Sequence, residues 1–303
     1  MPKPAIFKDE ELQRKFDEDG FVSFSMFSAE QVQRIHAFYL RTQVAHETIA
    51  ESKKFHATNE TNNADLIGES DQFIKSVFME EVDKHFTDYQ VIAANYLVKQ
   101  PHLESELGPH QDLRFVDEEQ FYSLNIWMAT TNTTKENGSL RFIRGSHLWA
   151  DTIRTLPSYP WKYREVITYL NNLFTDVETK IGDCVVINHA CIHSSYPNLS
   201  STVRVAAIMA IIPKTAEIKH YFLPEGNPEN EVEEYNMTLS DFIELKVGHR
   251  PQHAQLIRTF KYDFSPIEHN CFQQLSQPLN NRVSTITTYA HIKQKISAFL
   301  RFA

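Results

Sequence analysis

The sequence predicts a mainly β protein with flanking helices. Strand-like runs recur between residues 91 and 213, and no helical pattern alternates with them. The lack of alternation argues against a parallel α/β sheet and for an antiparallel sandwich or barrel with helices packed outside it. Aromatic residues make up 12% of the 303 residues, with 21 Phe and 12 Tyr, which favours a thick, sheet-rich core.

The first 90 residues are expected to form a helical layer. Ser28 followed three residues later by Gln31 is a capping-box pattern at the start of a helix. A glycine at position 20 follows an amphipathic stretch and is a typical helix stop. We expect helices at 8–19, 28–50 and about 69–86, and a short strand at 21–27.

The central region carries the strand signals. The strongest is the apolar run 203–213, which Pro213 closes. The other expected strands are 91–98, 121–128, 139–143 and 184–187.

No repeat or linker divides the chain, so we expect one domain over residues 1–303. Within it we expect the helical layer 1–90, a core 91–255 with a partly helical insertion at about 150–176, and a C-terminal extension 256–303. The acidic stretch 224–234 is predicted to be a surface loop, with a helix at about 239–246 after it.

Charge and cysteine content narrow the function classes. The net charge of −9, from 30 basic and 39 acidic residues, argues against a nucleic-acid partner. Three cysteines without a Cys-x-x-Cys pair indicate reduced thiols and no zinc ribbon. The sequence contains no run of about 18 apolar residues, so we expect no membrane span. The first residues lack a signal-peptide pattern, so a cytoplasmic location is expected.

A candidate metal-binding pattern is His110-Gln-Asp112. Residues two apart on a strand point to the same side, so a histidine and a carboxylate in this spacing can hold one metal ion. The pattern has low specificity, because a second triplet of the same kind, His102-Leu-Glu104, is present. Taken alone, such a triplet is more typical of polar residues on a solvated strand edge.

A third ligand would complete the two-histidine, one-carboxylate set of non-haem Fe(II) oxygenases. His189 and His193, which follow the buried strand 184–187, are the two candidates. Arg204 lies beyond them as the only charged residue in the run 203–213. A charge in such a run needs a partner, either a core acid or a ligand carboxylate held by the two-pronged guanidinium.

Three ordered segments then carry a resemblance. They are His110-x-Asp112, the stretch 136–147 with Asn137-Gly138 and Gly145-Ser146-His147, and His193-x-Ser195 with Arg204. Together with weaker matches at 16–22 and 94–99, they resemble the phytanoyl-CoA dioxygenase family over about residues 10–255. That family comprises Fe(II)- and 2-oxoglutarate-dependent oxygenases. The resemblance implies a double-stranded β-helix (jelly-roll, cupin-like) core.

The resemblance also implies roles for matching residues. His110, Asp112 and His193 match the iron ligands, and the spacing to Arg204 favours His193 over His189. Arg204 and Ser195 match the pair that holds the distal carboxylate of 2-oxoglutarate, and Trp127 lies near a co-substrate-contacting position. His147 is expected to make a structural hydrogen bond.

Three further residues are candidates for the substrate cavity. Arg114 and Phe115 directly follow the His-x-Asp triplet, and exposed strand-end positions are the alternative for both. Lys99 faces either the pocket or water.

The predicted function is an Fe(II)- and 2-oxoglutarate-dependent dioxygenase that hydroxylates an unactivated C–H bond of a small-molecule or lipid-like substrate. The resemblance implies dioxygen as oxidant and succinate and CO2 as co-products. Because family halogenases leave the carboxylate position small, Asp112 favours hydroxylation, although desaturation and ring closure use the same ligands. The rivals are a non-catalytic jelly-roll binding protein with a vestigial metal site, and a zinc hydrolase. The basic helical pattern within 280–303 is expected to pack on the domain or on a second copy in a homodimer.

Overall fold

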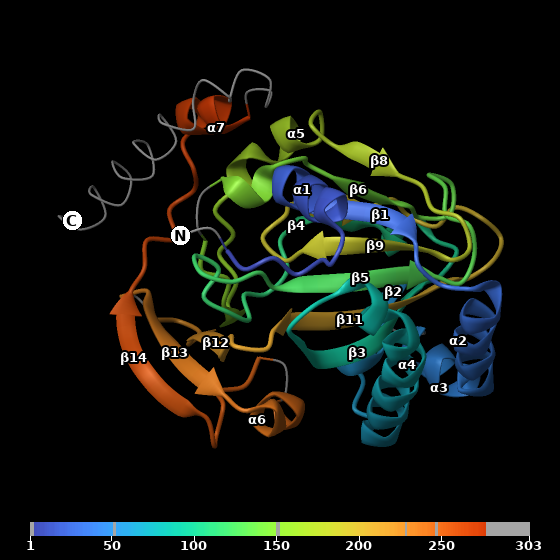
Figure 1. The fold of residues 1–303 in the computed structure, drawn as a ribbon. Helices are drawn as coiled ribbons and strands as arrows, with labels where there is room; N and C mark the ends of the chain where they lie inside the picture. Colours follow the sequence, from blue (N-terminus) through green and yellow to red (C-terminus); the bar gives the residue numbers. More distant parts are fainter. Residues whose placement is uncertain (1–2, 51–52, 150–151, 228, 246–247, 277–303) are drawn as a thin grey trace.

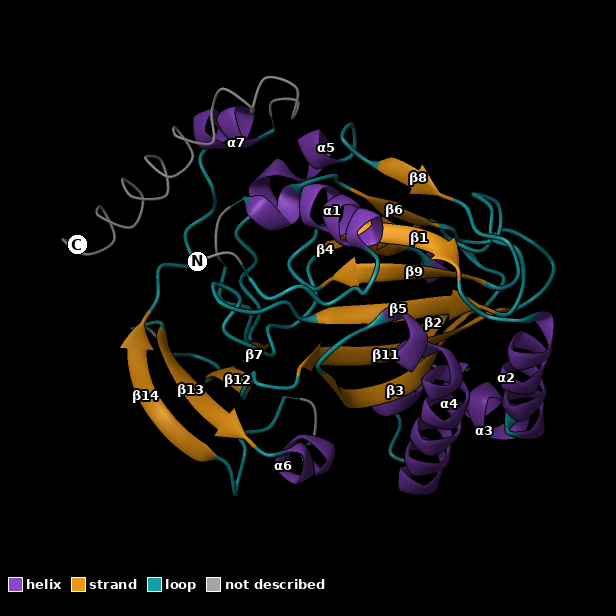
Figure 2. Ribbon diagram, in the orientation of Figure 1, coloured by secondary structure: helices purple, strands orange, loops and turns teal. Residues whose placement is uncertain are grey.

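The computed structural model describes residues 3–50, 53–149, 152–227, 229–245 and 248–276. Two antiparallel sheets enclose an apolar interior, and helices cover the outer face of the larger sheet (Figures 1 and 2). The predicted mainly β fold with a jelly-roll core and an N-terminal helical layer is therefore confirmed. The predicted helix within 280–303, and the dimer contact assigned to it, lie outside the described residues.

The larger sheet contains the strongest strand of the sequence at its centre. Its order is β1-β9-β5-β11-β3-β2, and all neighbours are antiparallel. The strands are β1 (Phe21–Ser25), β2 (Phe55–Ala57), β3 (Tyr89–Lys99), β5 (Leu124–Ala129), β9 (Asp183–Asn188) and β11 (Arg204–Pro213).

The smaller sheet has the order β4-β10-β6-β8. Its strands are β4 (Leu107–His110), β6 (Leu140–Phe142), β8 (Thr175–Val177) and β10 (His193–Ser195). Pairing of β4 with β10 places His110 directly opposite His193. Backbone register thus brings together two residues that lie far apart in the chain.

A third sheet has the order β14-β13-β12-β7 and projects beside the barrel (Figure 1). Its strands are β7 (Leu156–Pro157), β12 (Ile218–Leu223), β13 (Glu231–Met237) and β14 (Gln255–Lys261).

The prediction of a loop over 224–234 is wrong at its end, because β13 begins at Glu231. The acidic side chains there form ion pairs: Glu233 pairs with Arg250, in the loop before β14, at 2.7 Å, and Glu234 pairs across the sheet with Arg258 at 2.7 Å. The expected boundary between residues 255 and 256 falls inside β14, which pairs with β13.

The helices pack mainly beside the larger sheet. They are α1 (Glu10–Asp19), α2 (Ala29–Arg41), α3 (Gln43–Ala50), α4 (Ala64–His85), α5 (Ile167–Leu170), α6 (Leu239–Glu244) and α7 (His269–Leu275), with 3-10 turns η1 (Thr58–Glu60), η2 (Leu103–Ser105), η3 (Ser146–Leu148) and η4 (Arg164–Val166). No helix among them is long and apolar enough to cross a bilayer.

The predicted helix 28–50 is divided in two. Ser28 and Gln31 form the expected capping box of α2. At Thr42 the side-chain hydroxyl donates to the carbonyls of Phe38 and Tyr39, and the helix is interrupted there.

Strand alternation sorts the side chains of β11 into two layers. Val205, Ala207 and Met209 pack in the cluster beneath the helices. Ala206 faces the other way, into the interior between the sheets, where Trp127 and Phe142 also lie. Arg204 has the same parity as Ala206, so the fold directs a guanidinium into the interior of the barrel.

Candidate metal centre and anion pocket

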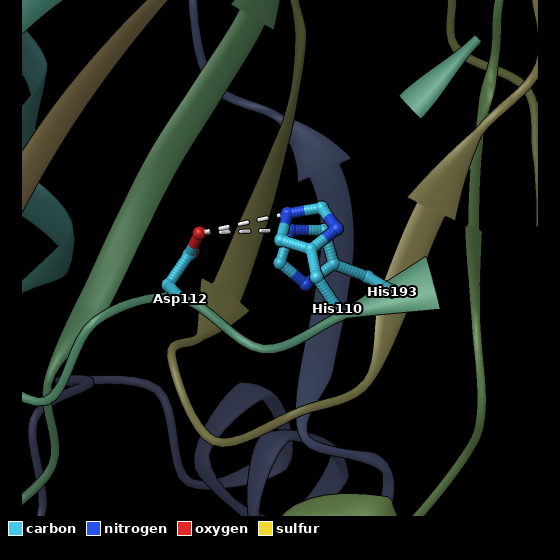
Figure 3. A group of neighbouring side chains, drawn as sticks. All are labelled: His110, Asp112 and His193. Atoms are coloured by element: carbon cyan, nitrogen blue, oxygen red, sulfur yellow. Dashed lines mark ion pairs between the residues drawn. The ribbon is translucent and has the colours of Figure 1, made fainter. Parts of the chain in front are cut away.

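His110, Asp112 and His193 converge at one end of the barrel interior. One ligand atom from each lies within 4.8 Å of the others. The Nε2 atoms of both histidines lie 3.9 Å from Asp112 Oδ1 (Figure 3). Each 3.9 Å separation is below about 4.2 Å, twice an ordinary metal–nitrogen or metal–oxygen bond of about 2.1 Å, so one ion can bridge either imidazole and the carboxylate, and the 4.8 Å limit keeps the other imidazole close to it.

Backbone and amide groups orient all three side chains. His110 Nδ1 lies 2.8 Å from the carbonyl of Gly108, and His193 Nδ1 lies 3.0 Å from that of Cys191. A carbonyl oxygen can only accept, so each Nδ1 carries the proton and each Nε2 presents its lone pair toward Asp112. Asn125 donates to Asp112 Oδ2 at 2.9 Å, which leaves Oδ1 for a metal.

The charge states of these groups suit a divalent cation. Burial, with the neighbouring His193, lowers the pKa of His110 to about 4, so its imidazole is neutral at pH 7. Burial alone would raise the pKa of Asp112, but the surrounding imidazoles and the Asn125 amide bring it below its ordinary value. Two imidazoles and one carboxylate on one side of a point fit the facial ligand set of mononuclear non-haem iron.

The alternative histidine, His189, does not join this group. Its Nδ1 lies 2.5 Å from the hydroxyl of Ser123, and its backbone carbonyl accepts from the amide of Asp112. Both side chains are buried. The other triplet, His102-Leu-Glu104, lies on the surface with both side chains largely exposed.

A pair of buried basic side chains is the second feature of the interior. Arg204 and Lys99 are directly paired across β11 and β3, and their side chains are 2% and 0% exposed. No acidic side chain in the described part of the chain forms an ion pair with either. A buried charge without a counter-charge is costly, so a bound anion would stabilise this pair.

The Arg204 guanidinium has two buried nitrogens, Nε and Nη1, without hydrogen-bond partners. Burial lowers the pKa of Arg204 to about 9. Lys99 Nζ donates to the carbonyl of Tyr196 at 2.8 Å and to that of Ser105 at 2.5 Å. Burial, and then repulsion by Arg204, lowers the pKa of Lys99 to about 6.

Further buried polar groups are Trp127, which lies against Arg204, and two serines. The Trp127 ring lies 5.5 Å from Arg204 Cζ, and its buried Nε1 has no partner; nor does the buried hydroxyl of Ser139. Ser195 is buried on β10, on the same side of the strand as His193. Trp127 lies on β5, which also carries Asn125.

Gly138 lies close to the Lys99 side chain and to the backbone of Tyr196. Its φ is +93°, and a Cβ there would lie 2.9 Å from Lys99 Cδ and 3.0 Å from the carbonyl oxygen of Tyr196. The Asn137-Gly138 turn therefore needs glycine both for its backbone conformation and for the approach of Lys99.

Two of the predicted substrate residues, Arg114 and Phe115, lie in the loop after the triplet and not on a strand, whereas Lys99 lies on β3. Arg114 is buried, with Nε donating to the carbonyl of Val116, so the alternative of an exposed strand end does not apply to it. Phe115 is half-buried and lies edge-on to the rings of His189 and Phe242, at 5.2 and 5.3 Å.

His147 and Cys191 make structural contacts within the fold. His147 Nε2 lies 3.0 Å from the carbonyl of Asp17, in line with the structural hydrogen bond expected for it. Gly20, at φ +82°, lies so close to that imidazole that a Cβ would be 2.4 Å from its Nδ1. Cys191 is buried beside Ser146, and burial raises the pKa of its thiol to about 12.

Sequence reasoning missed several polar residues of the site. Asn125 is one residue in an alternating strand, and only the sheet register shows that it faces Asp112. The sequence leaves Lys99 facing either the pocket or water. Its place beside Arg204 depends on the pairing of two strands that lie far apart in the chain, so no local pattern indicates it. No sequence pattern indicates a role for Gln111 or Arg154.

Comparison with known proteins points to one family. The family model of phytanoyl-CoA dioxygenase matches residues 16–206. "Phytanoyl-CoA dioxygenase 1" of Oryza sativa subsp. japonica is 36% identical over 129 residues, which cover 40% of this chain and 44% of that protein. "Phytanoyl-CoA dioxygenase domain-containing protein 1" of Rattus norvegicus is 35% identical over 124 residues, covering 38% and 42%.

The chain belongs to the phytanoyl-CoA dioxygenase family. The matched segments span less than half the length of these two relatives. Among solved structures, the epimerase SnoN in complex with Fe3+, alpha ketoglutarate and nogalamycin RO superimposes with a TM-score of 0.51 at 17% identity, covering 86% of this chain and 96% of that one. This likeness supports the fold.

Proposed function

We propose that the protein is an Fe(II)- and 2-oxoglutarate-dependent dioxygenase that hydroxylates a small-molecule or lipid-like substrate. The observation that carries the proposal is the combination of a two-histidine, one-carboxylate centre with a buried pair of basic side chains, Arg204 and Lys99, that lacks a counter-ion. A metal centre alone would serve a hydrolase or a structural site. The buried basic pair in the same barrel supports, in addition, the binding of an acidic co-substrate.

His110, Asp112 and His193 would hold the metal, and Arg204 with Ser195 and Trp127 would hold the co-substrate. When bound, iron and 2-oxoglutarate supply the oxidising chemistry, with dioxygen as oxidant and succinate and CO2 as co-products. Lys99 is assigned here to the anion pocket and not to the substrate, because its ammonium group is buried next to Arg204.

The chain's own residues orient and shield this chemistry. Arg204 offers a planar set of donors that matches the distal carboxylate in shape and charge. Asn125 holds one oxygen of Asp112, so the carboxylate has one orientation toward the metal. The packed interior around Phe142 and Trp127 excludes water from the pocket.

Hydroxylation of an apolar region of the substrate is the proposed reaction type. Asp112 fills the coordination position that a halide would need. Partly buried aromatic side chains, Phe115, Phe121 and Phe242, pack together near the loop that follows Asp112. Their surface favours an apolar or lipid-like substrate over a strongly charged one. Arg114, in the same loop, is the proposed polar contact.

Anaerobic binding tests the proposal without knowledge of the substrate. Purified protein is titrated with Fe(II) and then with 2-oxoglutarate, and the visible spectrum is recorded. We expect one metal ion per chain and a weak metal-to-ligand charge-transfer band that needs both additions. Asp112→Ala should lose the metal and the band.

Glu104→Ala is the matched control. It removes the acid of the other His-x-acid triplet, which lies on the surface, and should bind metal and 2-oxoglutarate like the wild type. A metal-binding protein without the band would favour the zinc hydrolase. A protein that binds neither component would favour the non-catalytic jelly-roll module.

A further inference from the structure

Gln111, between the two ligands of the His-x-Asp triplet, makes three hydrogen bonds through its side-chain amide. Its side chain is 3% exposed. Its Nε2 donates to the carbonyl of Ala190 at 2.7 Å, and its Oε1 accepts from Thr152 Oγ1 and from Trp161 Nε1, both at 3.2 Å. An indole nitrogen only donates and a carbonyl only accepts, so these partners fix the orientation of the amide.

These partners come from two different segments. Ala190 lies in the turn between β9 and β10, three residues before His193. Thr152 and Trp161 belong to the insertion that the sequence places at about 150–176. Tyr159, also in the insertion, donates from its hydroxyl to the backbone carbonyl of Gln111 at 3.1 Å. The Gln111 amide therefore joins the insertion to both segments that carry ligands.

Arg154 makes a second connection from the same insertion. Its side chain is 1% exposed, and its Nε donates to the backbone carbonyl of Asp112. Its Nη2 donates to the buried carboxylate of Glu118, and Nη1 donates to the carbonyl of Thr152 at 3.0 Å. Asp112 and Glu118 lie at the start and in the middle of the irregular loop between β4 and β5, so one guanidinium holds this loop at two points.

We propose that Gln111 and Arg154 are positioning residues for the metal centre, and that the insertion acts as a brace holding Asp112 and His193 at binding distance. Arg154 fixes the backbone at Asp112. Gln111 fixes the His-x-Asp segment against the turn that leads to His193. Neither side chain touches the metal. The inference rests on the proposed ligand set, because the brace has a function only if these residues bind a metal.

The position of the three ligands needs such support. Asp112 lies beyond the end of β4, in a loop without regular hydrogen bonding, while His110 and His193 are fixed by strand pairing. A ligand on a loop loses its geometry more readily than one on a strand. Loss of groups that orient metal ligands typically weakens metal binding about 10- to 100-fold.

The test measures the affinity of the protein for Co(II), by calorimetry and by the visible spectrum of the bound ion, together with the Tm of the metal-free protein. Arg154→Lys keeps the charge but cannot reach Asp112 and Glu118 together. We expect about 10- to 100-fold weaker Co(II) binding and a changed visible spectrum. Gln111→Glu keeps the acceptor for the insertion but replaces the donor to Ala190 with an oxygen, and it should also weaken Co(II) binding at least tenfold.

Arg164→Lys is the matched control. Arg164 belongs to the same insertion, but its Nη1 donates to the carbonyls of Trp161 and Phe264, away from the ligands. It should lower the Tm to a similar extent and leave Co(II) affinity unchanged. If Arg154→Lys and Gln111→Glu lower only the Tm and bind Co(II) within threefold of the wild type, the brace is refuted.

The outcomes also separate the inference from the function on which it rests. A wild-type protein that binds no Co(II) refutes the ligand set itself. Should Arg154→Lys fail to fold, Gln111→Glu decides alone. A Gln111→Glu protein with wild-type affinity and an unchanged spectrum overturns the proposal.

Discussion

Arg204 offers a sharp test of the anion pocket, through the substitution Arg204→Lys. The guanidinium has two buried donors, Nε and Nη1, that no protein group accepts. Lysine keeps the charge but cannot form two parallel hydrogen bonds to a carboxylate. Loss of one charge-assisted hydrogen bond costs about 1.5–3 kcal/mol, which corresponds to about 10- to 100-fold weaker 2-oxoglutarate binding.

Stability measurements separate this account from a purely structural role. In the ligand-free protein Arg204 is a buried cation beside Lys99, without a counter-ion. Replacement of an unpaired buried charge by an apolar side chain is expected to be neutral or stabilising. Arg204→Met should therefore abolish 2-oxoglutarate binding while it leaves the Tm of the ligand-free protein unchanged or raises it.

The assay is calorimetric titration of the metal-loaded, anaerobic protein with 2-oxoglutarate, accompanied by thermal melts without ligand. Ser195→Ala serves as a graded comparison, because a neutral hydrogen bond is worth about 1 kcal/mol, or about fivefold in Kd. The reasoning is refuted if Arg204→Lys leaves the Kd for 2-oxoglutarate unchanged and Arg204→Met lowers the Tm strongly, since Arg204 would then act through an internal contact.

Two further predictions concern the same pocket, and a third concerns the reaction product. Burial and then the nearby Arg204 lower the pKa of Lys99 to about 6, against the attraction of Glu106 and with a smaller contribution from Arg141. Its amine is therefore mostly neutral at pH 7.5. A bound dianion raises that pKa, so 2-oxoglutarate binding should be accompanied by proton uptake and should weaken as the pH rises above 6. Calorimetry in buffers of different ionisation enthalpy should show this proton uptake. The Lys99→Met protein should lack it. Gly138→Ala introduces strain and a contact with Lys99 Cδ, and should weaken 2-oxoglutarate binding several-fold without loss of metal, whereas equal affinity in a titration would contradict the geometry. With substrate, labelled dioxygen should enter the product as one oxygen atom, and a chlorinated product in high chloride would contradict the role given to Asp112.

The sequence contains enough information to predict the fold class and to nominate the three converging residues. His110 and Asp112 are two residues apart, and the resemblance to the family, through the spacing between His193 and Arg204, favours His193 over His189. The structure adds the physical reason: β4–β10 pairing brings the two histidines together, whereas His189 is held by Ser123.

What the sequence could not indicate depends on register between distant strands and on loops. The pairing of Lys99 with Arg204 joins two strands through a sheet order that no local pattern encodes. Gln111 is the middle position of a short motif, and Arg154 lies in an insertion without a clear periodic pattern. Several of their partners are backbone carbonyls, which every residue has, and the others lie far away in the chain, so composition and spacing give no signal for these contacts.

The most direct test of the proposed chemistry is the fate of labelled dioxygen during 2-oxoglutarate turnover. The Fe(II)-loaded protein is incubated with 2-oxoglutarate under labelled dioxygen, and succinate is analysed by mass spectrometry. The account predicts succinate that carries one labelled oxygen atom, formed by the wild type and by Glu104→Ala and not by Asp112→Ala. Absence of succinate above the metal-free control, or succinate without label, would contradict the assignment of the protein as a 2-oxoglutarate-dependent dioxygenase.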